Sequence, residues 1–115
     1  MSLLRDAGVD LRACIEACQR CQSVCTTTLV HCLDKGGKHA GSDHIRLLVD
    51  CADICGTSAG FMLRDSPLHH WTCGACAAVC EACARDCEAM ADDEEMRRCA
   101  TVCHECAELC RAMAG

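Results

Sequence analysis

The chain has few of the residues that normally build a hydrophobic core. It contains one Trp, one Phe and no Tyr, and Leu, Ile, Val and Phe together supply 20 of its 115 residues. A charged chain with less than about one fifth of these residues begins to resemble a disordered one. Only two abundant residue types can fill this deficit: Ala, which favours helices, and Cys, which packs as a small hydrophobe.

The charge pattern and the lack of long apolar runs exclude several classes of function. The net charge is −6, from 11 basic and 17 acidic residues, and there is no basic patch. With aromatic stacking groups nearly absent, a nucleic-acid partner is not expected. No stretch approaches the 18 or so apolar residues of a membrane span, and the start MSLLRDAGVDLRAC lacks the apolar run of a signal peptide. We therefore expect a cytoplasmic protein without a membrane partner, in which dense cysteine indicates metal binding or catalysis rather than disulfides.

Breaker residues divide the chain into four helical segments within one domain, residues 1–115. The glycines at 36–37 end the first segment, and Ser66 followed by Pro67 predicts a helix start with Pro67 at its first position. Asp92 and Glu95 have the spacing of a capping box. No segment alternates like a strand, and the short connections predict an all-α, antiparallel, up-down-up-down four-helix bundle. The predicted helices cover roughly 9–35, 42–65, 67–90 and 93–113.

Sixteen cysteines follow the rhythm of a buried helix stripe. In CGACAAVCEACARDC, residues 73–87, the steps run three, four, three, four, and within the other helices every step is three, four or seven. Residues three or four apart share one helix face. A bundle that turns all four stripes inward has a cysteine-lined core. The stripes consist of Cys14, Cys18, Cys21, Cys25 and Cys32; Cys51 and Cys55; Cys73, Cys76, Cys80, Cys83 and Cys87; and Cys99, Cys103, Cys106 and Cys110.

Stripes of thiols are typical of a site for soft metal ions. Thiolates select Cu(I), Zn and iron–sulfur clusters. Seven C-x-x-x-C pairs place two sulfurs on one helix face, which suits Cu(I), whereas Zn requires four converging ligands and iron–sulfur motifs lie in loops. The pattern thus predicts multiple Cu(I) ions in a row, with all sixteen cysteines as ligands. Loading near one Cu(I) per Cys would balance the thiolate charge.

Further soft donors extend the stripes at both ends of the expected bundle. His44, Met90 and Met96 are candidate ligands near Cys32, although core filling explains the methionines equally well. We favour this end as the place where copper is admitted, because the acidic residues 92–95 would attract cations. Pro67 and Trp71 are expected to plug the opposite end. His39 is expected to be solvated in its glycine loop, and surface roles are expected for His31 and His104, which lie off the stripe.

Several motifs together resemble the cytosolic copper storage proteins, a bacterial family of four-helix-bundle, cysteine-rich copper-binding proteins. The resemblance covers almost the whole chain. It implies Cu(I) storage along the bundle core, assembly into a homotetramer, no catalytic turnover, and copper uptake at one polar end; a copper metallochaperone is a candidate partner. The motifs are ACIEAC at 13–18, HIRLLVDCADIC at 44–55, DSP at 65–67, CGACAAVCEACARDC at 73–87 and CATVCHECAELCRAMAG at 99–115.

Three alternative functions remain open on the sequence. The first is a Zn or heavy-metal scavenger, the second an iron–sulfur electron-transfer protein, and the third a redox buffer that cycles thiols. An enzyme is not expected, because a reactive thiol needs a nearby base in a partly open site. Cys103 and His104 are neighbours in sequence, yet they point about 100° apart on a helix.

Overall fold

The computed structural model describes residues 2–114, and the side chains of residues 10–114. Four α-helices and one short 3-10 helix make up the described chain, in which there is no strand, so the predicted all-α four-helix fold is confirmed. The elements are α1 (Ser2–Lys35), η1 (Gly37–Ala40), α2 (Ser42–Leu63), α3 (His69–Glu88) and α4 (Glu94–Met113).

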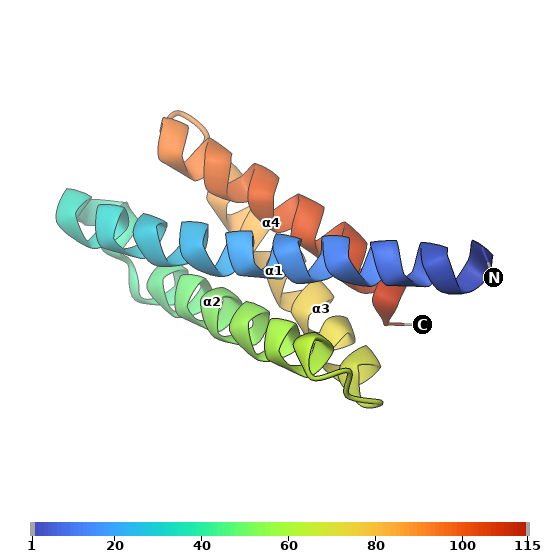
Figure 1. Ribbon diagram of the computed structural model, residues 1–115. Coiled ribbons are helices and arrows are strands. Elements are labelled where there is room, and N and C mark those ends of the chain that lie inside the picture. The colour runs from blue at the N-terminus through green and yellow to red at the C-terminus, as the bar shows by residue number, and fades with distance from the viewer. Residues whose placement is uncertain (1, 115) are drawn as a thin grey trace.

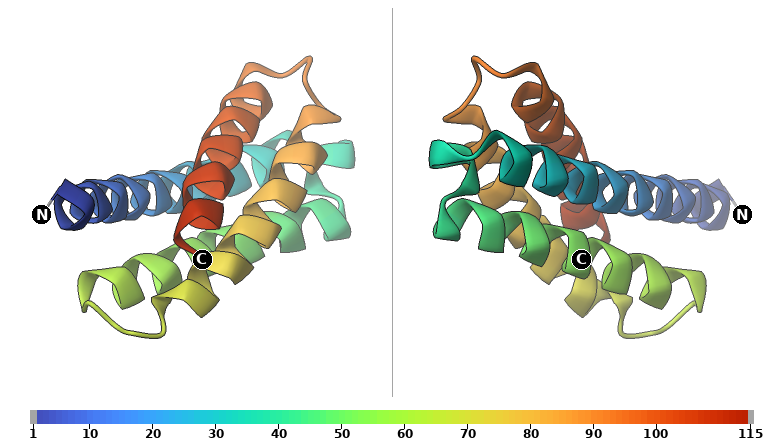
Figure 2. Two further views of the ribbon diagram at one scale, coloured as in Figure 1. Left: turned by 90° about the vertical axis from the view of Figure 1, so that its right-hand side faces the viewer. Right: turned by 90° about the vertical axis from the view of Figure 1, so that its left-hand side faces the viewer.

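The helices form two antiparallel hairpins, α1 with α2 and α3 with α4, and the second hairpin crosses over the first (Figure 1, Figure 2). Each helix packs against two neighbours, so that the four follow one another around a closed ring. The molecule measures 52 × 21 × 18 Å. An elongated bundle of this kind encloses a narrow interior along its axis, onto which every helix presents one face.

The turn between α1 and α2 depends on a glycine pair. Gly36 and Gly37 have φ angles of 74° and 58°, a left-handed conformation that costs little only without a Cβ atom. The N–H of Gly36 donates to the carbonyl of Cys32 over 3.0 Å, which closes the last turn of α1. The chain then reverses through η1 and enters α2 at Ser42, as the sequence predicts.

Three predicted helix starts differ from the structure. The first helix begins at Ser2 rather than near residue 9. The third helix begins at His69 rather than Pro67, and its N-cap is Leu68 rather than Ser66. The Ser66 hydroxyl accepts from the N–H of Leu68 over 3.1 Å within the turn that precedes the helix. The fourth helix is capped by Asp93 rather than Asp92. Asp93 Oδ1 accepts from the N–H groups of Glu95 and Met96, over 2.9 and 3.2 Å.

Cysteine and alanine make up most of the core. All sixteen cysteines are fully buried and none forms a disulfide. Small alanine side chains beside the stripes let the helix backbones approach closely, which brings the thiols of different helices together. The buried alanines are Ala17, Ala59, Ala77, Ala84, Ala100 and Ala107. No described helix combines the length and hydropathy needed to cross a membrane.

Candidate metal centre

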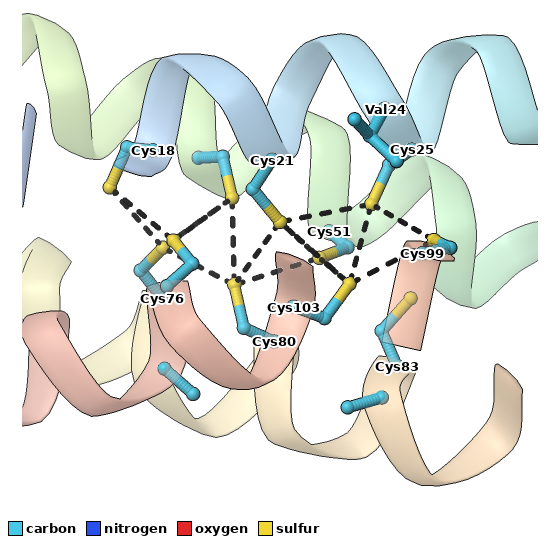
Figure 3. Close-up of a cluster of buried hydrophobic side chains, with 14 of the residues drawn as sticks. Cys18, Cys21, Val24, Cys25, Cys51, Cys76, Cys80, Cys83, Cys99 and Cys103 are labelled. Carbon is cyan, nitrogen blue, oxygen red and sulfur yellow. Dashed lines mark hydrogen bonds between the residues drawn. The ribbon is translucent and has the colours of Figure 1, made fainter. Parts of the chain in front are cut away.

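The four helices direct their thiols toward one another along the bundle axis (Figure 3). Cys21 Sγ lies 3.8 Å from Cys51 Sγ on α2, 4.0 Å from Cys80 Sγ on α3 and 3.7 Å from Cys103 Sγ on α4. Distances of this size allow sulfurs from different helices to reach a common metal ion, given metal–sulfur bonds of about 2.3 Å. The stripe therefore becomes a three-dimensional network of donors rather than a set of separate pairs.

Four groups of cysteines bring all their Sγ atoms within 4.8 Å of one another. Neighbouring groups share cysteines. At most two of the four groups can therefore be occupied without using any cysteine twice. Shared sulfurs can bridge adjacent metal ions, which makes the network continuous. The groups are Cys18, Cys76, Cys106 and Cys110; Cys21, Cys55, Cys80 and Cys106; Cys21, Cys25, Cys51 and Cys103; and Cys25, Cys83, Cys99 and Cys103.

The buried thiols cannot all be ionised at once. The sulfurs of Cys83 and Cys99, followed by burial, raise the pKa of Cys87. Hydrogen bonds from Cys103 and Cys25 lower the pKa of Cys99. Each thiolate is thus stabilised only while its neighbours keep their protons. The metal-free core holds mostly neutral thiols, and cations that replace the protons would remove the repulsion between thiolates.

Cys32 lies at one end of the stripe among donors that are not cysteines. Its thiol donates to Met96 Sδ over 3.5 Å, and its Sγ lies 3.3 Å from His44 Nε2 and 3.8 Å from His39 Nδ1. Two of the three additional candidate ligands, His44 and Met96, are therefore next to sulfur. The third, Met90, is buried, but no described thiol donates to it.

His39 corrects the sequence-based expectation of a solvated loop residue. Its side chain is only 5% exposed, because η1 folds back over the end of α1 and places the ring against Cys32. Sequence periodicity could not identify it, since His39 lies outside the stripes. The glycines at 36–37 were the available signal: they imply a tight reversal that returns the next residues to the helix end.

The surroundings of Cys32 keep its thiol protonated. Burial raises its pKa to about 11, and the negative charge of Asp93 adds to the effect. His44 is held in place from the far side of its ring, where Nδ1 pairs with Asp86. A hydrogen bond of this kind fixes the orientation of a metal-binding imidazole.

Two stripe positions near Cys32 are occupied by residues other than cysteine. Thr28 on α1 is 2% exposed and Leu48 on α2 is fully buried. They fall between the Cys32 cluster and the next thiols of their helices, Cys25 and Cys51. Cys32 makes its three sulfur and nitrogen contacts with histidine and methionine alone. The end cluster is therefore chemically distinct from the four-sulfur groups.

The opposite end of the bundle is not plugged by the residues expected there. Trp71, in the first turn of α3, is 71% exposed, and Pro67, in the turn before α3, is also exposed. The end of the stripe is instead lined by Cys73, whose Sγ lies 3.5 Å from Ser58 Oγ and 3.9 Å from His69 Nδ1. Sequence reasoning did not identify Ser58, a buried hydroxyl one turn beyond Cys55 in the same stripe.

The two histidines predicted to lie off the stripe do so. His104 is exposed and pairs with Glu88. His31 is half-buried, and its Nε2 lies 3.0 Å from Asp93 Oδ2. His31 and Asp93 line an open pocket of about 550 Å³ beside the Cys32 cluster, together with Lys35, Glu94, Glu95 and Arg98.

Comparison with known proteins gives a consistent result. The sequence model of a family described as copper storage protein matches residues 8–115. Among solved structures, a Nitrosospira multiformis protein is 45% identical, with a TM-score of 0.87 over 93% of this chain and 96% of that one. The Cu(I)-bound copper storage protein BsCsp3 is 40% identical, with a TM-score of 0.86 over 92% of this chain and 99% of that one.

Two further relatives are more distant or matched over a shorter region. A cytosolic copper storage protein from Streptomyces lividans, with five coppers, is 33% identical, with a TM-score of 0.85 over 93% of this chain and 96% of that one. An uncharacterized cysteine-rich protein of Bacillus subtilis, YhjQ, is 42% identical over 67 residues, which span 58% of this chain and 62% of that protein.

Proposed function

Since the chain belongs to the copper storage protein family, we propose that it stores multiple Cu(I) ions along its core, near one ion per cysteine. The observation that carries this proposal is the continuity of the sulfur network: all sixteen thiols are buried, and the four-sulfur groups share members. The proposed ligands are these sixteen cysteines, with His44 and Met96 next to them at the Cys32 end. Met90 is a weaker candidate, because no thiol contact supports it.

Charge balance explains why the core would take up many copper ions. A dry interior tolerates few unpaired charges, and here it contains sixteen ionisable thiols. Each Cu(I) that binds replaces a thiol proton, so a loaded core with about one copper per thiolate is nearly neutral. Bridging sulfurs make that ratio attainable, because each can contact two ions.

We place copper uptake at the Cys32 end. His39, His44 and Met96 give this end a mixed set of donors, from which Cu(I) exchanges more easily than from several thiolates. The adjoining pocket carries the carboxylates of residues 93–95 against two cationic side chains, Lys35 and Arg98, and its net negative charge favours the approach of cations. At the opposite end a His and a Cys are also in contact, but among the side chains that the structure describes no second imidazole or thioether there contacts sulfur.

The wider setting is part of the same proposal. The protein stores copper in the cytoplasm without catalytic turnover, assembles as a homotetramer, and receives copper from a metallochaperone. The family resemblance supports the tetramer, and the name of the S. lividans relative supports the location. Surface apolar side chains such as Val30 and Leu33 on α1 and Val49 on α2 are exposed in the single chain and would suit packing between subunits.

Zinc binding is the second candidate, because each four-sulfur group could hold one tetrahedral Zn. No more than two of the groups can be filled without sharing a cysteine, so closed Zn sites would leave half of the thiols unused. Cu(I), at about one ion per thiol, would use all sixteen. The arrangement of the thiols therefore favours Cu(I) because Cu(I) would use more of them. The geometry of any one four-sulfur group does not distinguish the two metals.

An anaerobic Cu(I) titration of the reduced protein against a coloured Cu(I) chelator tests the proposal. We expect the chelator to stay uncoloured until well over about ten equivalents have been added, because the thiolate network outcompetes it. Colour from the first addition, or after only a few equivalents, would contradict storage. A capacity close to half the number of cysteines would contradict the ratio of one copper per thiol.

A further inference from the structure

A second group of metal-binding side chains lies outside the sulfur network. One ring nitrogen each of His31 and His39 and a carboxylate oxygen of Asp93 all lie within 4.8 Å of one another. The three residues come from α1, from η1 and from the N-cap of α4. The group contains no sulfur, unlike the thiols proposed to hold Cu(I).

Neighbouring contacts hold the donors of this group in place. Asp93 Oδ1 is committed to capping α4, which leaves Oδ2 to face His31 Nε2 at 3.0 Å. The other nitrogen of that ring, Nδ1, lies 3.4 Å from Glu95 Oε1. A carboxylate on the far side of an imidazole orients the ring and makes it a better metal ligand.

His39 completes the group from the buried side. Its ring is 5% exposed and lies edge-on to the ring of His31, with centroids 6.1 Å apart. Nδ1 has only a weak contact, 3.8 Å from Cys32 Sγ. A nearly buried imidazole with so little hydrogen bonding gains from a further partner.

We propose that His31, His39 and Asp93 form a binding site for one borderline divalent cation of the Zn(II) class. Two imidazoles and one carboxylate are a common ligand set for Zn(II), with the fourth position left to water. The open pocket beside His31 and Asp93 gives solvent access to that position. Cu(I) prefers the thiols nearby, so the two metals would compete only for His39, which also lies beside Cys32.

Lys35 competes with a metal for the same carboxylate. Its Nζ lies 2.6 Å from Asp93 Oδ2, and its side chain is about half exposed, so it can move into solvent. A divalent cation must displace this ammonium to bind. Replacing Lys35 by Met should therefore tighten metal binding, whereas an ion pair with a purely structural role would give no such gain.

Histidine-selective ¹⁵N NMR of the reduced, copper-free protein, titrated with Zn(II) beyond the capacity of the thiols, tests the site. We expect the imidazole resonances of His31 and His39 to shift together over one further equivalent of Zn(II), with those of His104 unchanged. Asp93→Asn retains the helix cap and should weaken this step by more than about tenfold. Lys35→Met should strengthen it.

The proposal is overturned if neither resonance moves at a large excess of Zn(II), or if Asp93→Asn and Lys35→Met leave the affinity of this step unchanged. His104→Ala, which alters an exposed histidine paired with Glu88, is the matched control and should not affect the step. Because the titration uses no copper, its failure would leave the copper proposal standing.

Discussion

Cys103 occupies a more central position in the network than most of the other thiols. Its Sγ lies 3.7 Å from both Cys21 and Cys25, and it belongs to two of the four-sulfur groups. Cys14, near one end, contacts Cys110 at 3.5 Å and belongs to none of the groups. Copper capacity should therefore depend unequally on individual cysteines.

Comparison of Cys103→Ser with Cys14→Ser tests this inequality. Loss of Cys103 removes a sulfur shared by two groups, so we expect it to lower the Cu(I) capacity by about two ions, and loss of Cys14 by about one. Both serine variants keep the side-chain volume similar, and circular dichroism would check that the helices remain. Equal losses in the chelator titration would show that the sulfurs act as independent ligands.

His44 tests the proposed point of uptake. Its Nε2 lies 3.3 Å from Cys32 Sγ, and its Nδ1 pairs with Asp86. We expect His44→Ala to slow Cu(I) uptake on the order of tenfold, the scale on which support of a metal ligand matters, and to leave the final capacity nearly unchanged. Stopped-flow measurement of Cu(I) transfer from a chelator to the protein would give the rate, and His104→Ala serves as the control. Equal uptake rates in the two variants would contradict uptake at this end.

At the scale of the helices, Asp93 links the start of α4 to the end of α1. It caps α4 and pairs with Lys35 and His31. These two partners, Lys35 first, hold the pKa of Asp93 below its ordinary value of 3.8. A carboxylate whose pKa is lowered by folding stabilises the fold at pH values above its ordinary pKa. This contribution is lost as the pH falls through the pKa of the folded state.

Two substitutions of Asp93 separate the cap from the charge. Asp93→Ala should lower the free energy of unfolding by about 1 kcal/mol more than Asp93→Asn, because Asn still caps the helix. The difference between wild type and Asp93→Asn should be largest at neutral pH and shrink as the pH falls below about 4. Urea unfolding from pH 3 to 7 measures both; a pH-independent difference would show that the ion pairs contribute nothing.

The sequence predicts the helix faces better than the helix ends. The three-four spacing placed all sixteen thiols inward, and each is fully buried, because a face requires only the periodicity of the helix. The ends depend on local competition: Ser66 caps a turn rather than a helix, and Asp93 takes the role expected of Asp92. His39 was missed because its burial follows from the path of η1, which no repeating pattern describes.

At the scale of the whole molecule, the contents of the core limit the stability of the metal-free protein. Cysteine and alanine bury little apolar area per residue, and Leu48, Met62 and Met96 are the largest fully buried side chains. Hydrophobic stabilisation scales with that area. The stability of this fold should therefore depend on bound metal more than the stability of most helical bundles does.

Copper loading should raise the stability of the fold substantially. A ligand that binds only the folded state adds about 2.7 kcal/mol when its free concentration is one hundred times its Kd, and here many ions bind. We expect the apparent Tm of the reduced protein to rise progressively with each added equivalent of Cu(I), as measured by anaerobic calorimetry. A Tm that stays constant during loading would mean that copper does not bind inside the folded bundle.

The central claim is that the core itself holds the copper. Anomalous diffraction at the copper edge from crystals of the Cu(I)-loaded protein tests it most directly. We predict a row of copper peaks along the bundle axis, each within about 2.3 Å of cysteine sulfurs, running from the Cys14 end to Cys32. Copper confined to surface histidines, with the core thiols free of metal, would contradict the account.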